Sequence, residues 1–240
     1  MKPIVFMTTY NRPELLAQSL PQVENEALSI GADFYIHDDQ SDSTDTLALL
    51  AEAGARDIHV FRRDYDRMQT NMNGHELTGL ANVHGFKYLL NEDPSWTHMI
   101  KVDDDTFWHP GGMRTMIEQY EKAESDGVDI LWLSGISTVN EEEMEDHCTY
   151  AVTNGCCNAA VIYRREDIES FLNDVPLPYI INDGFDSCIL WRWAPKFRPN
   201  GKSVTVKPSV VYHTGITGVH VRDMDLNRNF IGGVDGIICK

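Results

Sequence analysis

The sequence predicts an α/β protein with a mostly parallel, twisted sheet and helices on both faces. The first observation is that short apolar runs rich in β-branched and aromatic residues alternate with longer segments of helical periodicity. The second is that several of these runs end in polar or acidic residues. The alternation of strands with helices predicts right-handed crossovers between parallel strands. The third is that 240 residues show no internal repeat, linker or compositional break, which favours a single domain over 1–240.

The first half of the chain alternates strictly between the two element types. Pro13 stands in the first turn of a helix, where its missing N–H costs nothing, and Gly54 marks the end of another helix. The predicted strands are 3–9, 34–39, 57–63 and 96–102, and the predicted helices are 13–20, 44–54 and 75–90.

The second half is less regular. Segments 110–124 and 129–135 read as a helix and a strand, and 156–167 reads as a strand that runs into a helix. The acidic run NEEEMED is interpreted as a solvated loop. Further predictions are a helix over 181–194 opened by an acid-rich loop, a strand pair or a strand broken at Pro208 over 203–215, and a C-terminal flap over 215–240.

Composition describes an acidic globular protein. Lys and Arg total 20 against 37 Asp and Glu, so the formal net charge is −17, and 42% of the residues are hydrophobic. This surplus counts against a nucleic-acid binder that relies on non-specific attraction. The five cysteines lack a CxxC spacing and indicate neither a disulfide framework nor a zinc ribbon. No membrane span or signal-peptide core is evident, so we expect a cytoplasmic protein.

The strongest functional signal is the motif MIKVDDDTFWHP at 99–110. It places Asp103, Asp104 and Asp105 after a predicted strand, where open α/β sheets bind ligands. Adjacent carboxylates repel unless a cation or hydrogen-bond donors compensate them, and oxygen-rich sites suit Mg²⁺ or Mn²⁺. Because strand side chains alternate, Asp103 and Asp105 would share one side and Asp104 would face the other. The alternative interpretation is an acidic turn that caps the next helix.

A second acidic signal lies in FYIHDDQSDSTDT at 34–46. Asp38 and Asp39 end a predicted strand, a position from which an acid can accept hydrogen bonds from a base or a ribose. The acids and the serine that follow, at 42, 43 and 45, are interpreted as caps of the next helix.

In order and spacing, these segments resemble the nucleotide-sugar-binding half of GT-A fold glycosyltransferases, most of all the family 2 type. The resemblance extends over nearly the whole chain, and it is specific over residues 1–110, which would bind the nucleotide sugar. Residues 111–240 would form the acceptor half and the flap. The segments that carry the resemblance are FMTTYNRPELL, HDDQSDSTDT, GLANVHGFKYLL and KVDDDTFWHPGG.

The resemblance implies roles for individual residues. The first strand and its loop would hold the nucleotide, Asp38 or Asp39 would read the base, and Asp103 and Asp105 would coordinate the metal as a DxD motif. The sequence departs from the family pattern in two places. HDDQSDSTDT is longer than the usual compact acid-Gly-Ser run, and the Arg that often precedes Asn82 is missing. The implied nucleotide-sugar contacts are Thr8, Thr9, Tyr10, Arg12, Asp38, Asp39, Asn82, Gly85 and Asp104.

The later half supplies a base and a third metal ligand by the same resemblance. INDGFDSCILWRW is similar to the family's acid-containing helix start, which makes Asp183 the first candidate for the catalytic base and Asp186 the second. The alternative role for Asp183 is the N-cap of a helix. His213, in VVYHTG, is the candidate third ligand and His220 its substitute, although a histidine after a strand is more often simply hydrogen-bonded.

The implied activity is transfer of a sugar from a nucleotide sugar, with a UDP-sugar favoured, to an acceptor hydroxyl. Two carboxylates, an imidazole and two phosphate oxygens form a hard ligand set with one borderline member, which favours Mn²⁺ over Mg²⁺. Inversion at the anomeric carbon is favoured, and retention is the alternative. The expected acceptor is a saccharide or another small hydroxylated molecule, ahead of a modified nucleic-acid base, and no membrane insertion is expected.

Two other functional classes fit parts of the sequence. A sugar nucleotidyltransferase shares the architecture and the acidic metal site, but it carries a Gly-rich basic loop after the first strand, where this chain reads TTYNRPE. A non-catalytic metal-binding or nucleotide-binding module would bind a nucleotide sugar without turnover.

Overall fold

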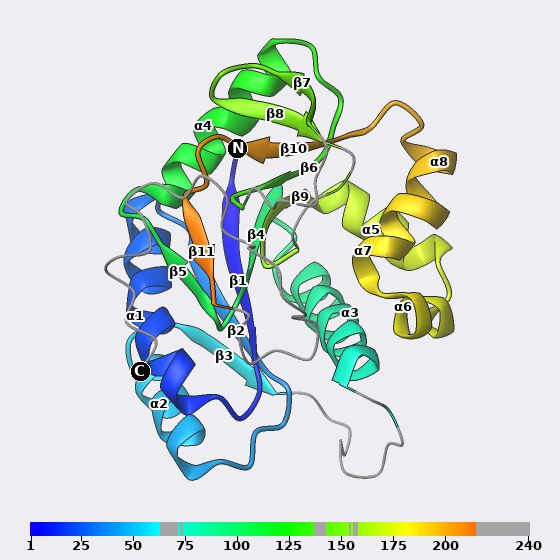
Figure 1. The fold of residues 1–240 in the computed structure, drawn as a ribbon. Helices are drawn as coiled ribbons and strands as arrows, with labels where there is room; N and C mark the ends of the chain where they lie inside the picture. The colour runs from blue at the N-terminus through cyan, green and yellow to red at the C-terminus, as the bar shows by residue number, and fades with distance from the viewer. Residues whose placement is uncertain (63–71, 73, 137–142, 154, 156–157, 215–240) are drawn as a thin grey trace.

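The computed structural model describes residues 1–62, 72, 74–136, 143–153, 155 and 158–214. Within them, most strands belong to one large sheet (Figure 1). Its strands are β1 (Pro3–Thr9), β2 (Asp33–Asp38), β3 (His59–Arg62), β4 (His98–Asp103), β6 (Ile130–Ser134), β7 (Glu143–Asp146), β8 (Tyr150–Thr153), β9 (Ala160–Arg164) and β10 (Lys202–Val206). A separate ribbon joins β5 (Thr106–Trp108) and β11 (Val211–His213).

The sheet has the order β3-β2-β1-β4-β9-β6-β10-β8-β7. β1 pairs in parallel with β2 and β4, β2 pairs in parallel with β3, and β6 pairs in parallel with β10. β9 runs antiparallel between β4 and β6, and β8 runs antiparallel between β10 and β7. All described strands of this sheet except β8 and β9 therefore point the same way, which confirms the mostly parallel α/β sheet that the sequence predicts.

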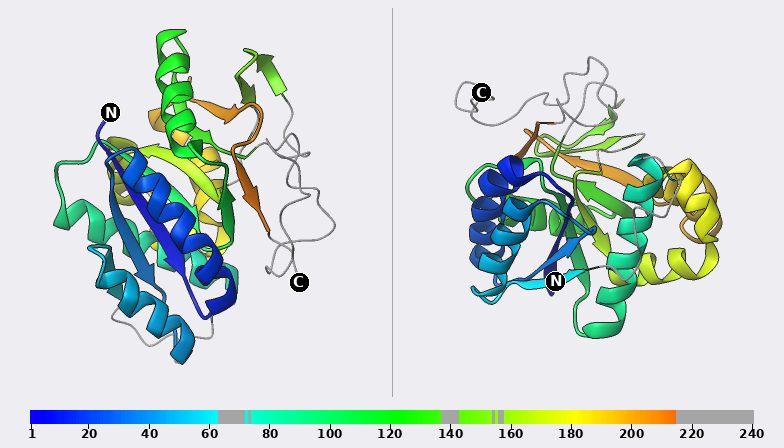
Figure 2. Two further views of the ribbon diagram at one scale, coloured as in Figure 1. Left: turned by 90° about the vertical axis from the view of Figure 1, so that its left-hand side faces the viewer. Right: turned by 90° about the horizontal axis from the view of Figure 1, so that it is seen from below.

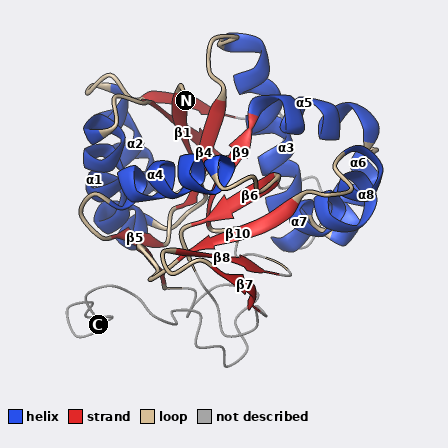
Figure 3. Ribbon diagram, turned by 90° about the horizontal axis from the view of Figure 1, so that it is seen from above, coloured by secondary structure: helices blue, strands red, loops and turns tan. Residues whose placement is uncertain are grey.

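Helices cover both faces of the sheet. Figures 2 and 3 show α1 and α2 on one side of the sheet and α3 with α5, α6, α7 and α8 on the other, and α4 packs with α1 and α2. The helices are α1 (Pro13–Ser29), α2 (Thr44–Gly54), α3 (Gly74–Glu92), α4 (Gly112–Ser125), α5 (Arg165–Asp174), α6 (Leu177–Asp183), α7 (Phe185–Cys188), the π-helix η2 (Ile189–Trp193) and α8 (Ala194–Phe197). None of these described helices combines the length and the apolar character that crossing a membrane requires.

Two hydrophobic cores follow from the alternation of side chains along β1. Val5 and Met7 face a core built with α1, α2 and α4. Ile4 and Phe6 face the opposite core, built with α3, α5, α6, α7 and η2. All four side chains are completely buried, because a strand with helices on both faces has no solvent-exposed side.

The predicted start of the first helix and both predicted ends of the second are confirmed, whereas the first helix runs on to Ser29 instead of ending at Leu20. α1 begins at Pro13, and α2 ends at Gly54. Ser43 is the N-cap of α2, where its side chain accepts a hydrogen bond from the Thr46 N–H at 3.4 Å. This bond satisfies one of the unpaired amides of the first turn, so the capping interpretation of this loop is correct for Ser43.

Two predictions in the second half are wrong. The acidic run interpreted as a solvated loop contains β7, an edge strand whose charges suit an exposed sheet edge. The acid-rich loop predicted to open the helix within 181–194 is instead the end of a helix, because Asp183 is the last residue of α6, Gly184 has a φ of 89° and α7 begins at Phe185. Glycine alone adopts this conformation readily. Asp183 is consequently not a helix N-cap.

The segment around Pro208 is confirmed as interrupted. β10 ends at Val206 and β11 begins at Val211, in the separate ribbon. The predicted C-terminal flap over 215–240 lies outside the described residues.

Candidate functional site

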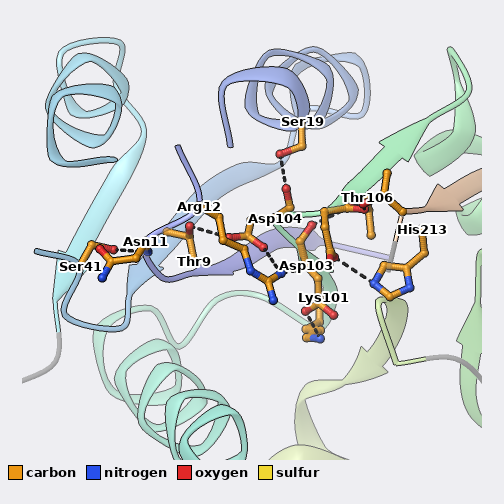
Figure 4. Close-up of polar contacts among 12 residues, drawn as sticks. Thr9, Asn11, Arg12, Ser19, Ser41, Lys101, Asp103, Asp104, Thr106 and His213 are labelled. Carbon is orange, nitrogen blue, oxygen red and sulfur yellow. Dashed lines mark hydrogen bonds and ion pairs between the residues drawn. The ribbon is translucent and has the colours of Figure 1, made fainter. Parts of the chain in front are cut away.

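The three consecutive aspartates lie where β4 ends. Thr8 of β1 pairs in register with Asp103, so the carboxyl ends of two central strands meet at this point. The Asp103 N–H donates to the Ala159 carbonyl at 2.9 Å, and the Ser19 hydroxyl donates to the Asp104 carbonyl at 2.7 Å. Neighbouring elements therefore fix the backbone of the motif on both sides (Figure 4).

The β5–β11 ribbon brings a distant histidine to this motif. His213 lies opposite Thr106, and the Thr214 N–H donates to the Asp105 carbonyl at 3.0 Å. The Nε2 atom of His213 is 2.9 Å from Asp105 Oδ1. Asp103, Asp105 and His213 each offer one ligand atom, and these atoms all lie within 4.8 Å of one another. The three predicted metal ligands thus lie together, whereas His220 lies outside the described residues.

The donor set fits a divalent cation. Two carboxylates and one imidazole converge from β4, the turn after it, and β11. Carboxylate oxygen is the preferred ligand of Mg²⁺ and Mn²⁺, and an added imidazole shifts the preference toward Mn²⁺. The chemistry of these side chains therefore suits a divalent metal ion.

Two basic side chains compensate the acids. Arg12 Nη1 donates to Asp104 Oδ1 at 3.2 Å and to Asp105 Oδ2 at 3.0 Å. Lys101, which is only 2% exposed, donates to Asp103 Oδ1 and also to the Asn158 carbonyl at 2.7 Å. The sequence prediction missed Lys101. A lysine two residues before Asp103, on the same face of a buried strand, was the available signal.

Burial and neighbouring charges set the protonation of these groups. The pKa of Asp104 is raised to about 7, first by burial and then by the charge of Asp105, against the opposing effect of Arg12. Burial also acts to raise the pKa of Asp105, but His213 and Arg12 together outweigh it and lower that pKa. Burial acts to lower the pKa of His213, but the hydrogen bond and charge of Asp105 raise it. Asp105 and His213 therefore favour an ion pair.

The loop after β1 touches the acidic motif directly. The Thr9 hydroxyl donates to Asp104 Oδ2 at 2.7 Å, and Arg12 bridges two of the acids. Thr8 and Tyr10 flank Thr9 and are half-buried. The predicted nucleotide contacts of the first loop thus stand beside the predicted metal ligands.

Asp38 and Asp39 lie next to this loop, at the end of β2. Asp38 is buried, and its Oδ1 accepts a hydrogen bond from the Ser41 N–H at 2.9 Å, while its Oδ2 is 3.5 Å from Arg62 Nε. The Asp39 N–H donates to the Thr9 carbonyl at 2.9 Å. Both predicted base-reading acids therefore border the first loop, and the Asp38 carboxylate also organises the β2–α2 loop.

Asn11 joins the loop after β1 to the loop between β2 and α2. The sequence prediction did not identify this role. Its backbone N–H donates to the Ser41 hydroxyl at 3.0 Å, and its side-chain amide donates to Asp42 Oδ1 at 2.6 Å. Its Oδ1 accepts hydrogen bonds from the N–H groups of Asp42 and Ser43 at 2.9 and 3.0 Å. Asn11 has a φ of 48°, a left-handed conformation that asparagine tolerates better than most residues.

We expect the Asn11→Ala variant to be destabilised by about 2 kcal/mol, because it loses these side-chain bonds and places alanine at a positive φ. Urea unfolding measures the change. Asn25→Ala, at an exposed position of α1, is the control and should leave stability nearly unchanged. Asn11→Gly should cost less than Asn11→Ala, since glycine removes the backbone strain. Equal stability of Asn11→Ala and the wild type would contradict the proposed loop clamp.

The two predicted contacts on α3 differ in their surroundings. Asn82 is buried, and its Oδ1 has no hydrogen-bond partner among the described residues. Such an orphan acceptor is costly unless a ligand or water satisfies it. Gly85 packs against β1, where an added Cβ would lie 2.2 Å from Phe6 Cζ. Close packing is thus sufficient to explain the glycine at 85.

The candidate bases stand on a different part of the fold. Asp183 is exposed at the end of α6, and its Oδ2 accepts a hydrogen bond from Arg192 Nε at 2.9 Å. Asp186 is half-buried in α7. α6 packs against α3, since a Cβ at Gly79 would lie 3.2 Å from the Ile180 carbonyl oxygen. No hydrogen bond or ion pair in the described part of the chain links either acid to the three aspartates.

No family model and no curated protein matches this sequence. Solved structures do match. The S. aureus TarS 1–349 structure has a TM-score of 0.56 and 16% identity, over 90% of this chain and 61% of that chain. The fold is of the GT-A type. This chain spans about three fifths of the length of TarS 1–349 and 37% of the longer TarS structure.

Two further structures share the GT-A-like architecture. The mannosyltransferase PcManGT from Pyrobaculum calidifontis, in complex with GDP-Man and Mn²⁺, has a TM-score of 0.52 and 11% identity, over 88% of this chain and 56% of that chain. A putative glucose-1-phosphate thymidylyltransferase from Bacillus anthracis, in complex with sucrose, has a TM-score of 0.53 and 9% identity, over 89% of this chain and 90% of that chain. Similarity at these identities establishes the fold alone, so the GT-A fold predicted from the sequence is confirmed.

Proposed function

We propose that this protein is a metal-dependent glycosyltransferase that moves a sugar from a nucleotide sugar, favoured as a UDP-sugar, to an acceptor hydroxyl. The observation that carries the proposal is the convergence of Asp103, Asp105 and His213 at the end of β4 in a GT-A fold. A TarS structure contains UDP, and the PcManGT structure contains GDP-Man and Mn²⁺. These complexes support a nucleotide-sugar donor.

Asp103, Asp105 and His213 would hold Mn²⁺ or, less well, Mg²⁺. When bound, the ion would act as a Lewis acid that stabilises the charge developing on the diphosphate leaving group. The first loop would hold the nucleotide through Thr8, Thr9, Tyr10 and Arg12, with Asp38 or Asp39 at the base. Asn82 Oδ1, buried without a partner in the described residues, would accept a hydrogen bond from the donor.

In the proposed reaction, the acceptor hydroxyl oxygen forms a bond to the anomeric carbon, and the bond from that carbon to the diphosphate oxygen breaks. The hydroxyl proton passes to the carboxylate of Asp183, with Asp186 as the second candidate base. Both hydrogen bonds from Arg192 go to Oδ2 of Asp183, which leaves Oδ1 to take the proton. Attack from the face opposite the leaving group inverts the anomeric centre. The proposed acceptor is a saccharide or another small hydroxylated molecule.

A thermal-shift panel of nucleoside diphosphates and nucleotide sugars, each with Mn²⁺ and with chelator, tests the donor site. A ligand that binds only the native state at about one hundred times its Kd stabilises it by roughly 2.7 kcal/mol. We expect a shift with uridine nucleotides that requires Mn²⁺. A folded sample that shifts with no nucleotide in either condition would contradict the proposed donor site.

The Asp183→Asn variant tests the base. We expect it to keep wild-type donor affinity and to lose transfer by about a hundredfold or more, because a base acts only in the chemical step. Donor binding is measured by calorimetry and transfer by UDP release with acceptor. Asp174→Asn, which removes another surface acid paired with a basic side chain, Lys196, is the matched control. Full activity of Asp183→Asn would move the role to Asp186 or elsewhere.

A sugar nucleotidyltransferase is the second candidate, because the thymidylyltransferase structure matches this chain over nearly its whole length. The sequence TTYNRPE, which spans the end of β1 and the start of α1, lacks the glycines of that class. The two reactions are separated by their products. A nucleotidyltransferase releases pyrophosphate from a nucleoside triphosphate and a sugar 1-phosphate, whereas the proposed enzyme releases a nucleoside diphosphate from a nucleotide sugar. Stable binding of a nucleotide sugar without either product would indicate a non-catalytic module.

A further inference from the structure

Arg12 occupies carboxylate oxygens that a metal ion would need. Its Nη1 is 3.0 Å from Asp105 Oδ2, while His213 Nε2 is 2.9 Å from Asp105 Oδ1. Both oxygens of Asp105 are therefore engaged by basic groups. A divalent cation can bind this carboxylate only if at least one of the two partners moves away.

Arg12 has more freedom to move than Lys101, the other cation at the motif. Lys101 is completely enclosed, and the Asn158 carbonyl holds its ammonium group in addition to Asp103. The Arg12 side chain is 36% exposed. It extends from the residue before α1 and makes no capping bond to that helix. The guanidinium can therefore swing toward solvent while Lys101 stays in place.

We propose that Arg12 is a resident counter-cation that exchanges partners when the site is loaded. It pairs with Asp104 and Asp105 in the metal-free protein, leaves Asp105 when a divalent cation binds, and then pairs with a phosphate oxygen of the donor. This inference rests on the proposed function for the metal and the diphosphate. Its physical basis is that the positive charge of Arg12, now paired with carboxylates through Nη1, exchanges one anionic partner for another.

The exchange makes binding of the metal and the nucleotide cooperative. When the metal binds alone, it displaces Arg12 from Asp105 without offering the guanidinium a new partner. The affinity of the site for the metal is therefore reduced. A diphosphate supplies that partner, so metal binds more tightly in its presence. By linkage, the metal strengthens nucleotide binding by the same factor.

The test is the affinity of Mn²⁺, measured by electron paramagnetic resonance of the free ion, with and without UDP. We expect Arg12→Met to bind Mn²⁺ alone about fivefold more tightly than the wild type, since a partly exposed ion pair no longer competes. UDP should tighten Mn²⁺ binding less in Arg12→Met than in the wild type. Arg12→Lys should remain close to the wild type. Arg56→Met, which removes an exposed arginine paired with Glu24 on the surface, should change neither value.

Unchanged or weaker Mn²⁺ binding by Arg12→Met without UDP would overturn this inference and leave the proposed metal site intact. Failure of every protein, the wild type included, to bind Mn²⁺ with or without UDP would instead overturn the proposed function. Thermal unfolding establishes that each variant is folded. If Arg12→Met does not fold, Arg12→Gln, which keeps hydrogen-bond donors without the charge, has the same expected result and the same contradicting result.

Discussion

The Asp105→Ala variant is expected to lose Mn²⁺-dependent nucleotide binding, with an affinity reduced by at least about a hundredfold. Loss of a group that only supports a metal ligand already costs 10- to 100-fold in affinity, and Asp105 would be a ligand itself. The change is measured by calorimetric titration of UDP in the presence of Mn²⁺ and again with chelator. The variant should resemble the chelated wild type in both conditions.

Two variants separate the loss of a ligand from damage to the fold. Asp105→Asn keeps the shape of the side chain and should also bind poorly, because a neutral amide is a weaker ligand than a carboxylate. Glu52→Gln removes an exposed acid of α2 and should bind like the wild type. Removing Asp105 also takes one carboxylate partner away from Arg12 and from His213, so unfolding must be followed in parallel. Undiminished Mn²⁺-dependent binding by folded Asp105→Ala would remove the metal assignment.

The Gly85→Ala variant is expected to be destabilised by about 3 kcal/mol, because the new Cβ would collide with the ring of Phe6. Phe6 is completely buried and contacts Phe86 edge-to-face at 5.4 Å between centroids, so the ring cannot move aside. For a chain of this size, the melting temperature should fall by roughly 6 to 12 °C. The sign of the change identifies the cause. Helix propensity alone would make the alanine variant more stable by about 1 kcal/mol, so a loss of stability indicates the collision with Phe6.

Gly54→Ala is the matched control, because it lies in α2 and its Cβ would meet only Val60, at 3.9 Å. That variant should be neutral or slightly stabilised. In the Gly85→Ala background, Phe6→Leu should recover part of the lost stability, which a double-mutant cycle measures. A Gly85→Ala protein that is as stable as the wild type but fails to bind donor would support the sequence-based role of Gly85 as a lining of the donor site.

The sequence predicts those parts of the fold that depend on local periodicity. The buried strands β1, β2 and β4 and the helices between them follow from alternating apolar runs and from Pro13 and Gly54 at helix ends. The position of the three aspartates follows from acids at the end of an apolar strand pattern. From the sequence, His213 is a candidate ligand only through the family resemblance, and the pairing of β5 with β11 is what brings it to Asp105.

The features that the sequence prediction missed depend on tertiary contacts or on backbone conformation. β7 forms because β8 offers a sheet edge, and its charged residues have little strand propensity of their own. The end of α6 depends on the positive φ of Gly184, which interrupts an otherwise helical pattern. Asn11 reads as an ordinary loop residue until its bonds to the next loop are seen. Lys101 gains its second partner, the Asn158 carbonyl, only when β4 and β9 lie side by side.

The pairing of His213 with Asp105 also has a consequence for protein synthesis. The neighbouring contact, from the Thr214 hydroxyl to the Asp105 carbonyl, spans 109 residues. At the usual elongation rates, these residues take roughly 5 to 20 seconds to translate. During that interval the nascent chain already contains the acids together with Arg12 and Lys101, but it lacks the imidazole. The acidic motif can therefore be neutralised by its own chain first, and the full set of candidate metal ligands exists only after β11 has left the ribosome.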